Sequence, residues 1–551
     1  MIAGLDGCLR VFMNRIVSRI VCGCLGAWLA TAGARAGDRW HIVARADNDL
    51  VRVLNDAGAK VQRFDDAATA VTQSPPGVGV LVLADQYPGQ TTRLTPELFD
   101  QARDNKVRLY VEYPSSVPTL TFGEPQTLKT GHWGNILERT VVASDGFGDA
   151  LKKHRILMIH DCHYLPVEAS QPHLVVARVA GYDDALYGLP KSDVHPILFE
   201  HPSGGVLVAT TKLSQFVTAR YAPLDAWEPV WRMILKWVEP DAEVPPLRWK
   251  PTVHPSFSRD AELPADVERQ ALQRGAGWYQ KSGLLVHPSR QAHYDRPANQ
   301  GPATADWPDG HRAGPGAGRG EPSGDGSLGL LEGFRSKIYH DGSQSVVWWR
   351  RADNHGESAG ALALAGSVLK QPEFTRIGSN LADWLTGQSV LYTREFADPK
   401  HPAFGLAGWN DVPRYFGGAH GYHQLWADDN ARAWLGLLRT AAALGTDRFD
   451  ERLAQQLLAM MRLTGRKGFA VPHIDLPSLA SGGWERHFKG DADDLSPHYQ
   501  AYLQACLLWG AKATGFPLFR ERAAKGIRRM METYPQGWSA TNDQYNQERA
   551  R

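Results

Sequence analysis

The sequence predicts a multidomain protein in which an α/β domain precedes an all-α domain. Its 551 residues exceed what one hydrophobic core usually organises. In the first half, short apolar runs alternate with helical patterns, which is typical of strands alternating with helices. In the second half, a junction carrying a phenylalanine recurs between helical patterns, at Phe374, Phe449 and Phe519, with spacings of 75 and 70 residues. Such repeats predict stacked helical hairpins.

The N-terminal segment has the pattern of an export signal. Arg10, Arg15 and Arg19 precede the apolar run 20–30, and residues 34–36 form an A-x-A cleavage pattern. We therefore expect a signal peptide at 1–36 and a periplasmic or secreted protein. Cys22-Gly23-Cys24 leaves lipoprotein anchoring open as an alternative. The apolar run is too short for a membrane span, so we expect no integral span once the signal is removed.

Composition narrows the class of partner. The chain has 43% hydrophobic and 22% charged residues, and its formal net charge of +1 gives no support to nucleic-acid binding. Its 18 tryptophans are suited to stacking against sugar rings. Without the signal only Cys162 and Cys506 remain, in different predicted domains, so no disulfide framework is implied.

Residues 37–240 read as a sheet of buried strands covered by helices. Strands are expected at 40–44, 80–84, 107–112, 155–159, 174–178, 197–199 and 205–209, and helices at 49–57, 96–103 and 225–238. Continuous apolar strands that alternate with helices indicate a mostly parallel sheet with both faces covered.

This pattern resembles the class I glutamine-amidotransferase-like and trehalose-utilisation-protein-like α/β domains, a flavodoxin-type architecture. Such domains often accompany carbohydrate enzymes as non-catalytic companions. An active amidotransferase needs Gly-x-Cys-x-Gly at a strained turn. The candidate here, His160-Asp161-Cys162-His163-Tyr164, lacks both glycines, so we expect a non-catalytic domain.

We predict neither a metal nor a cofactor. His160, Cys162 and His163 are conceivable metal ligands, but a polar cluster at the sheet end is the preferred interpretation. The sequence contains no G-x-x-x-x-G-K, and its G-x-G-x-x-G run, Gly324 to Gly329, falls in a Gly- and Pro-rich stretch and not between a predicted strand and helix, so nucleotide binding is unsupported.

The segment between the two halves is irregular. Residues 241–264 are proline-rich and are expected to form a linker, followed by a helix at 265–281. Residues 288–329 are dominated by Gly, Pro, Ala and Asp. They offer little apolar surface to offset the entropy of ordering, which predicts a disordered insertion.

Each repeat of the C-terminal domain, residues 265–551, contains two helices. The first helices are expected at 355–369, 429–444 and 498–514, and the second at 376–386, 451–463 and 521–533. Helical hairpins of this length stack into a solenoid or a closed ring. The loops within the repeats, rich in Gly, Trp, His and Asp, should then emerge at one end.

This domain resembles the six-hairpin (α/α)6-toroid glycosidases. The resemblance lies in the hairpin repeat and in residues 351–357, 426–432, 496–499 and 547–549. It implies cleavage of glycosidic or uronosyl bonds by Asp and Glu at the mouth of the ring, and some relatives are polysaccharide lyases. A full toroid has about twelve helices. The sequence shows seven and the start of an eighth at Gln547, so the ring is expected to be incomplete or the chain truncated.

Candidate catalytic residues are the acidic groups at these helix starts. Glycoside hydrolysis needs an acid and a base or nucleophile on opposite sides of the bond. Adjacent residues rarely meet both roles, so we expect Asp428 or Asp429 to act with Glu357 or Glu548. Helix capping is the plain alternative for Asp428, Asp429 and Asp353, and a solvated first turn for both glutamates.

The remaining candidates are expected to bind the substrate. They are Asp353, Arg351, Arg432, Trp409, Trp426, His420, His423, Trp484, His498, Tyr499 and Trp538. The arginines suit a uronate carboxylate, although they could instead pair with neighbouring aspartates. The tryptophans could stack on sugars or simply anchor loops. His420 and His423 are three residues apart without an evident third metal ligand.

The sequence therefore predicts an exported, metal-independent glycoside hydrolase acting on an oligo- or polysaccharide. A polysaccharide lyase, in which His498 or a tyrosine removes the proton α to a uronate, is the second hypothesis. The third is a glycan-binding or scaffold protein without turnover. The sugar, its linkage, the stereochemistry and the oligomeric state are not defined by the sequence.

Overall fold

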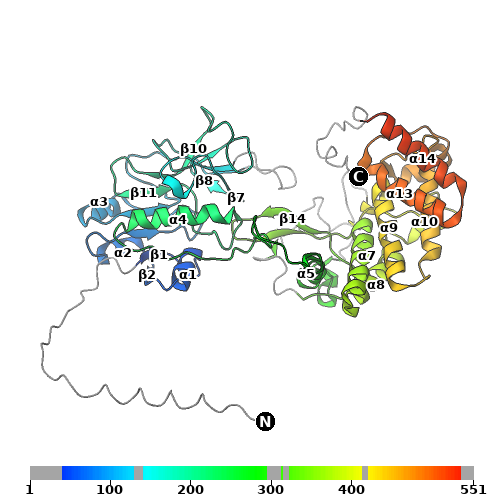
Figure 1. Cartoon of the computed structure of the whole chain (residues 1–551), viewed down its shortest axis with the longest axis horizontal. Coiled ribbons are helices and arrows are strands. Elements are labelled where there is room, and N and C mark those ends of the chain that lie inside the picture. Colours follow the sequence, from blue (N-terminus) through cyan, green and yellow to red (C-terminus); the bar gives the residue numbers. More distant parts are fainter. Residues whose placement is uncertain (1–39, 129–139, 295–311, 314–321, 413–419, 535–551) are drawn as a thin grey trace, which may run out of the picture.

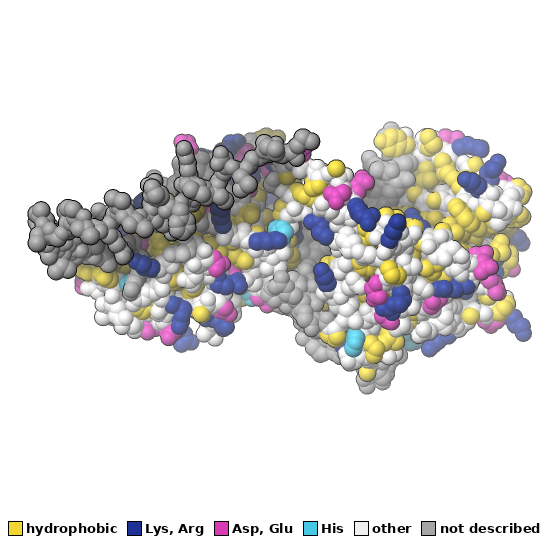
Figure 2. Space-filling view, turned by 60° about the horizontal axis from the view of Figure 1, so that its bottom comes forward, with side chains coloured by type: hydrophobic (Ala, Val, Ile, Leu, Met, Phe, Trp, Pro, Cys, Tyr) yellow, Lys and Arg dark blue, Asp and Glu magenta, His cyan; other side chains and the backbone are white. Residues whose placement is uncertain are grey.

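The computed structural model describes residues 40–128, 140–294, 312–313, 322–412 and 420–534. An α/β part and a helical part lie at opposite ends of an elongated molecule, with strand β14 Gly333–Ile338 between them (Figure 1). Charged side chains of both signs are interspersed over the face shown in Figure 2. No described helix is long and apolar enough to span a membrane. The chain thus combines an α/β unit with helical hairpins, as the sequence predicts.

The α/β part is built on one ten-stranded sheet with the order β12-β7-β6-β9-β10-β11-β4-β3-β1-β2. Its strands are β1 Trp40–Val43, β2 Val61–Phe64, β3 Val80–Val82, β4 Leu109–Glu112, β6 Thr140–Ala143, β7 Ile156–Ile159, β9 Leu174–Ala177, β10 His195–Glu200, β11 Val206–Ala209 and β12 Tyr221–Ala222. A separate pair is formed by β5 Gln126–Thr127 and β8 His163–Tyr164.

The prediction of a mostly parallel sheet is wrong for half of it. Strands β2, β1, β3, β4 and β11 pair in parallel, but every pair from β11 through β10, β9, β6 and β7 to β12 is antiparallel. Strands joined by loops without a crossover helix can pair antiparallel, as β10 and β11 do. Apolar runs alone do not distinguish these two arrangements.

Both faces of the parallel strands are buried, which explains their unbroken apolar runs. Ile42, Leu81 and Tyr110 belong to one core cluster and Val80 and Leu109 to another. Helix α4 Leu224–Val238 adds the fully buried Trp227 and Trp231 to the first cluster. The other helices of this part are α1 Asp49–Asp56, α2 Ala67–Gln73 and α3 Pro96–Asp104.

The connecting segment is only partly a spacer. No helix or strand is assigned between α4 and α5 Val267–Lys281, as expected for the proline-rich stretch. However, Leu247 is buried in the α/β core, and the ring of Trp249 lies 4.6 Å from that of Phe216. The first half of the segment is therefore packed against the α/β part.

Part of the predicted disordered insertion is ordered. Residues 295–311 and 314–321 lie outside the described residues, but η2 Pro288–Arg290, α6 Gln291–Tyr294 and β13 Arg312–Ala313 are assigned. The backbone N–H of Gly324 donates to Leu285 O at 3.0 Å. At Gly329, φ is +83°, and an added Cβ would lie 2.9 Å from His355 Nε2. Glycine here permits close packing, so the prediction is wrong for residues 322–329.

The three predicted helical hairpins are present. They are α7 Ala352–Leu369 with α8 Pro372–Gly387, α9 Ala427–Leu444 with α10 Asp450–Leu463, and α13 Pro497–Thr514 with α14 Pro517–Glu532. Short helices α11 Leu476–Gly482 and α12 Glu485–Phe488 follow α10. Helix α9 packs between α7 and α13. The described helices form a row of hairpins, and ring closure is not seen among them.

Helices α7 and α9 approach each other at backbone distance. An added Cβ on Gly356 would lie 2.6 Å from Ala433 O and 2.7 Å from Ala433 Cα. Gly360 likewise faces Gly436. Because both helices begin at the same end, this contact fixes the relative position of their first turns.

Candidate functional site

The first turns of α7, α9 and α13 bring the predicted polar residues together. Their N-caps are Arg351, Trp426 and Ser496, respectively. Next to the start of α9, strand β16 Gln424–Trp426 pairs with β17 His473–Asp475. Residues about 75 positions apart in the sequence therefore meet at one end of the hairpin row.

The aspartates of these helices are not caps. The side chains of the N-cap residues Arg351 and Trp426 make no capping hydrogen bond, and Asp353, Asp428 and Asp429 lie buried in the first turns. The capping interpretation is therefore wrong for all three. Carboxylates near helix N-termini still benefit from the helix dipole. Burial of three of them in one place demands partners of opposite charge.

Arg351 is the first such partner. Its Nη2 donates to Asp429 Oδ1 at 2.6 Å and to Asp353 Oδ2 at 2.9 Å, and its Nη1 donates to Glu332 Oε1 at 3.0 Å. Burial lowers the pKa of Arg351, but Asp353, Asp429 and Glu332 outweigh this effect and raise it well above its ordinary value. The guanidinium therefore links α7, α9 and the approach to β14.

Arg432 is the second partner and lies one turn further along α9. Its Nε and Nη2 donate to the two carboxylate oxygens of Glu357 at 2.9 and 3.1 Å. Its Nη1 is 3.7 Å from Asp353 Oδ2 and 3.8 Å from Asp428 Oδ2. Both arginines are thus engaged by carboxylates of the chain itself, which is the alternative to uronate binding that the sequence left open.

Asp353 and Asp429 interact with each other and differ in their proton affinity. Burial and the neighbouring Asp353 raise the pKa of Asp429 well above its ordinary value, against the charge of Arg351. Burial would also raise the pKa of Asp353, but Arg351 and Arg432 outweigh it and lower that pKa. A carboxyl that retains its proton at neutral pH can serve as a general acid.

His498 brings α13 into the cluster. Its Nε2 lies 3.3 Å from Asp428 Oδ2. Among the described residues, Asp428 Oδ1 is buried without a hydrogen-bond partner, and so is Asp353 Oδ1. Two acceptor atoms without partners in one place favour a ligand or water there over a purely structural role.

Aromatic rings line the same end. Trp426 stacks on Tyr499, with ring centroids 5.8 Å apart and an interplanar angle of 17°, and Trp409 lies 5.9 Å from Trp426. Arg351 lies over the ring of Trp409 at 5.4 Å. Trp409 and Trp426 are therefore adjacent to the carboxylate cluster.

The other predicted residues pack against side chains that do not belong to this cluster, or lie outside the described chain. His420 packs against Tyr422 and His423, with ring centroids 5.2 and 5.1 Å apart. Trp484 packs on Phe488 and beneath Arg462, which matches loop anchoring better than sugar binding. Glu548 and Trp538 lie outside the described residues.

Sequence reasoning missed Glu332 and Tyr502. Glu332 accepts hydrogen bonds from Arg351 and from the indole N–H of Trp349, and burial raises its pKa. Tyr502 lies beneath Arg432, whose Cζ is 5.5 Å from the ring centroid. A single Glu within an apolar run was the available signal for Glu332. Tyr502, one turn beyond His498 on the same helix, could have been found by helical spacing.

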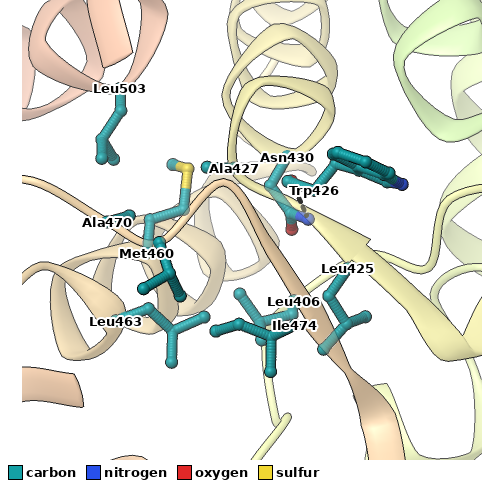
Figure 3. Close-up of a pocket in the computed structure, with 11 residues that line it drawn as sticks. Leu406, Leu425, Trp426, Ala427, Asn430, Met460, Leu463, Ala470, Ile474 and Leu503 are labelled. Carbon is teal, nitrogen blue, oxygen red and sulfur yellow. Dashed lines mark hydrogen bonds between the residues drawn. The ribbon is translucent and has the colours of Figure 1, made fainter. Parts of the chain in front are cut away.

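A small apolar cavity lies at the start of α9 (Figure 3). It measures about 20 Å³, and Leu406, Met460 and Ile474 are among its lining residues. Asn430 at its edge accepts from Ala407 N at 2.8 Å and donates to Ala407 O and Trp426 O. A volume of this size holds roughly one water molecule and no sugar. The cavity is part of the scaffold.

Comparisons with known proteins add little to this description. No protein-family model and no curated protein matches the chain. Among solved structures it is similar to one described as a novel alpha-amylase from Clostridium perfringens, with 11% sequence identity and a TM-score of 0.23. The match covers 37% of this chain and 48% of that one, so the chain spans about half the length of that structure. A TM-score of this size defines neither fold nor function.

Proposed function

We propose that the chain is an exported glycoside hydrolase whose site lies at the first turns of α7, α9 and α13. The observation that carries the proposal is the buried carboxyl cluster at these first turns, in which Arg351 bridges Asp353 and Asp429. One turn further along, Glu357 pairs with Arg432 in the same cluster. Hydrolysis of a glycosidic bond needs one carboxyl group as the acid and a second as the base. Burial and the neighbouring Asp353 raise the pKa of Asp429, which suits it to the role of the acid.

In this mechanism Asp429 donates its proton to the glycosidic oxygen as the bond to the anomeric carbon breaks. Glu357, in its ion pair with Arg432, accepts a proton from the attacking water. Asp428 is the alternative to Glu357 and lies against His498. Arg351 positions the carboxyl of Asp429 through the 2.6 Å contact. No metal is required for these steps.

The charge of the site favours a neutral sugar. Five carboxyl groups, those of Glu332, Asp353, Glu357, Asp428 and Asp429, surround two guanidinium groups. With Asp429 protonated the sum is still −2, from four carboxylates and two arginines. A uronate would be repelled and would have to displace a carboxylate from Arg351 or Arg432.

Domain organisation forms part of the same proposal. The α/β part serves as a non-catalytic companion related to amidotransferase-like domains, since Cys162 is buried and burial raises its pKa to about 12. The hairpin row corresponds to part of an α/α toroid. Export by the signal at residues 1–36 completes the proposal and rests on the sequence alone.

The test is release of reducing sugar by the chain from Gly37 onward, measured on panels of neutral and of uronate-containing polysaccharides. Asp429→Asn should lower kcat by about 10²–10⁴-fold. The matched control Asp450→Asn removes an exposed first-turn carboxyl on α10 and should leave the rate unchanged. Full activity in both Asp429→Asn and Glu357→Gln would refute the assignment.

A polysaccharide lyase is the alternative that the contact between His498 and Asp428 favours, because a carboxylate can orient an imidazole base. Its signature is an unsaturated product that absorbs in the ultraviolet, formed from a uronate substrate. Tight binding of an oligosaccharide without either product would instead indicate a glycan-binding protein.

A further inference from the structure

The α/β part of the chain meets the hairpin that precedes α7 at a second polar cluster. The loop between β7 and β8 contacts the hairpin of β14 Gly333–Ile338 and β15 Gln344–Val347. The N–H of His340 donates to Asp161 Oδ2 at 3.0 Å. Asp161 itself has φ of +58°, a left-handed conformation that is costly for a non-glycine residue. Such strain needs a local reason.

Asp161, His163 and His340 point their polar atoms at one another. Asp161 Oδ2 is 3.1 Å from His340 Nδ1, and Asp161 Oδ1 is 3.4 Å from His163 Nε2. One ligand atom from each residue lies within 4.8 Å of the other two. The Asp161 side chain is 2% exposed, whereas the two imidazoles are 24% and 22% exposed, so an ion can reach the cluster from solvent.

We propose that this cluster binds a divalent first-row transition-metal ion such as Zn²⁺. Two imidazoles and one carboxylate form a donor set typical of Zn²⁺ and Fe²⁺ sites, and they leave coordination positions open for water. Mg²⁺ and Ca²⁺ prefer oxygen donors throughout. Both the donor types and their mutual distances therefore favour a transition metal.

The surroundings orient the imidazoles for this role. His163 Nδ1 is 3.0 Å from Thr127 Oγ1, which leaves Nε2 facing Asp161. Such a second contact on a ligating histidine is a regular feature of metal sites. Tyr87 packs edge-on against both rings, at centroid distances of 5.8 Å from His163 and 5.7 Å from His340. The three ligands are thus held in place without the ion.

Two neighbours suggested by the sequence are not ligands. Cys162 is fully buried and its Sγ contacts Thr211 Oγ1, away from solvent. His160 Nδ1 accepts from Ile338 N at 3.3 Å. His160 thus joins the loop to the hairpin, whereas Cys162 is packed within the α/β part.

Lys337 provides the sharpest means of testing the proposal. Its Nζ is 2.7 Å from Asp161 Oδ1 and 4.6 Å from the centroid of the Tyr339 ring. The ammonium therefore occupies part of the space beside the carboxylate, and it competes with a metal ion for the same charge. Removing it should strengthen metal binding, whereas a purely structural ion pair makes no such prediction.

The experiment uses the full chain from Gly37, freed of metal with a chelator and titrated with Co²⁺ while the visible absorption of the bound ion is followed. We expect about one equivalent to bind and Zn²⁺ to displace it. His163→Gln and His340→Gln should each weaken binding by at least about tenfold, and Lys337→Met should strengthen it. His254→Ala, which removes an exposed histidine of the connecting segment, is the matched control.

Two outcomes would overturn the proposal. One is that neither the wild-type chain nor Lys337→Met binds Co²⁺, although both retain native circular dichroism. The other is that His163→Gln and His340→Gln titrate like the wild type, which would place the ion elsewhere. Neither outcome depends on hydrolase activity, so the site is tested independently of the proposed function.

Discussion

Replacing Gly356 with alanine tests whether the approach of α7 to α9 holds the candidate site together. An alanine in a helix interior normally gains roughly 0.5–1 kcal/mol over glycine. At Gly356 the new Cβ would lie 2.6 Å from Ala433 O and 2.7 Å from Ala433 Cα. Both atoms belong to the backbone, so the helices must separate. Overpacking of this kind costs typically 1–3 kcal/mol.

The expected net effect is a loss of about 1 kcal/mol, which corresponds to a fall in Tm of roughly 2–4 °C for a unit of 150–250 residues. Far-UV circular dichroism during heating measures it, because the hairpins dominate the helical signal. The matched control Gly275→Ala lies in the interior of α5, where an added Cβ meets nothing within 4 Å. It should raise Tm slightly. An increase in Tm for Gly356→Ala as well would refute the close-packed interface.

Three further predictions concern charge and burial. Burial raises the pKa of Glu239 to about 7, so its contribution to stability is present below about pH 4.5 and is lost as pH rises through 7. Between pH 5 and 8, the free energy of unfolding of the wild type should therefore fall by about 1–2 kcal/mol relative to that of Glu239→Gln, and thermal denaturation at each pH measures the difference. Arg351→Lys cannot span Glu332, Asp353 and Asp429, and it should destabilise the helical part by about 3 kcal/mol in urea denaturation. Cys162 should resist alkylation in the native chain and react only in denaturant, and fast native labelling would contradict its burial.

Local sequence patterns predicted the helical hairpins well because their determinants are local. Each inner helix has an uninterrupted small-apolar pattern, and Phe374, Phe449 and Phe519 are all buried at corresponding places. The ends of the observed helices differ from the predicted ones by a few residues at most. Sheet topology was predicted less well, because an apolar strand carries no information about the direction of its neighbour.

The candidate site was predicted only in part, because its residues carry local signals but the contacts between them depend on tertiary packing. Asp428, Asp429, Arg432 and Glu357 could be identified because they flank helix starts, but their pairing depends on how α7 packs against α9. Glu332 reaches the cluster from the approach to β14, where no helical pattern marks it. Spacing along the chain could not reveal such contacts.

The junction cluster shows this limit most clearly. His163 lies in a stretch that the sequence marks as polar, but His340 is 177 residues further on and lies in a hairpin for which no metal motif exists. Ligand-spacing rules apply to sites formed within one loop or one helix. A site assembled from two parts of a chain is visible only once the fold has brought them together.

Stability alone does not account for the carboxylate cluster of the hairpin row. Asp353, Asp428 and Asp429 are buried and cap nothing, so each pays a desolvation penalty that an apolar side chain would avoid. Replacing a buried ion cluster by apolar residues is often neutral or stabilising. The arginines that offset the penalty leave Asp428 Oδ1 and Asp353 Oδ1 without partners among the described residues. A costly cluster with acceptor atoms still available is consistent with selection for chemistry at this end of the helices. Asp429→Asn should therefore lower turnover while it raises the free energy of unfolding.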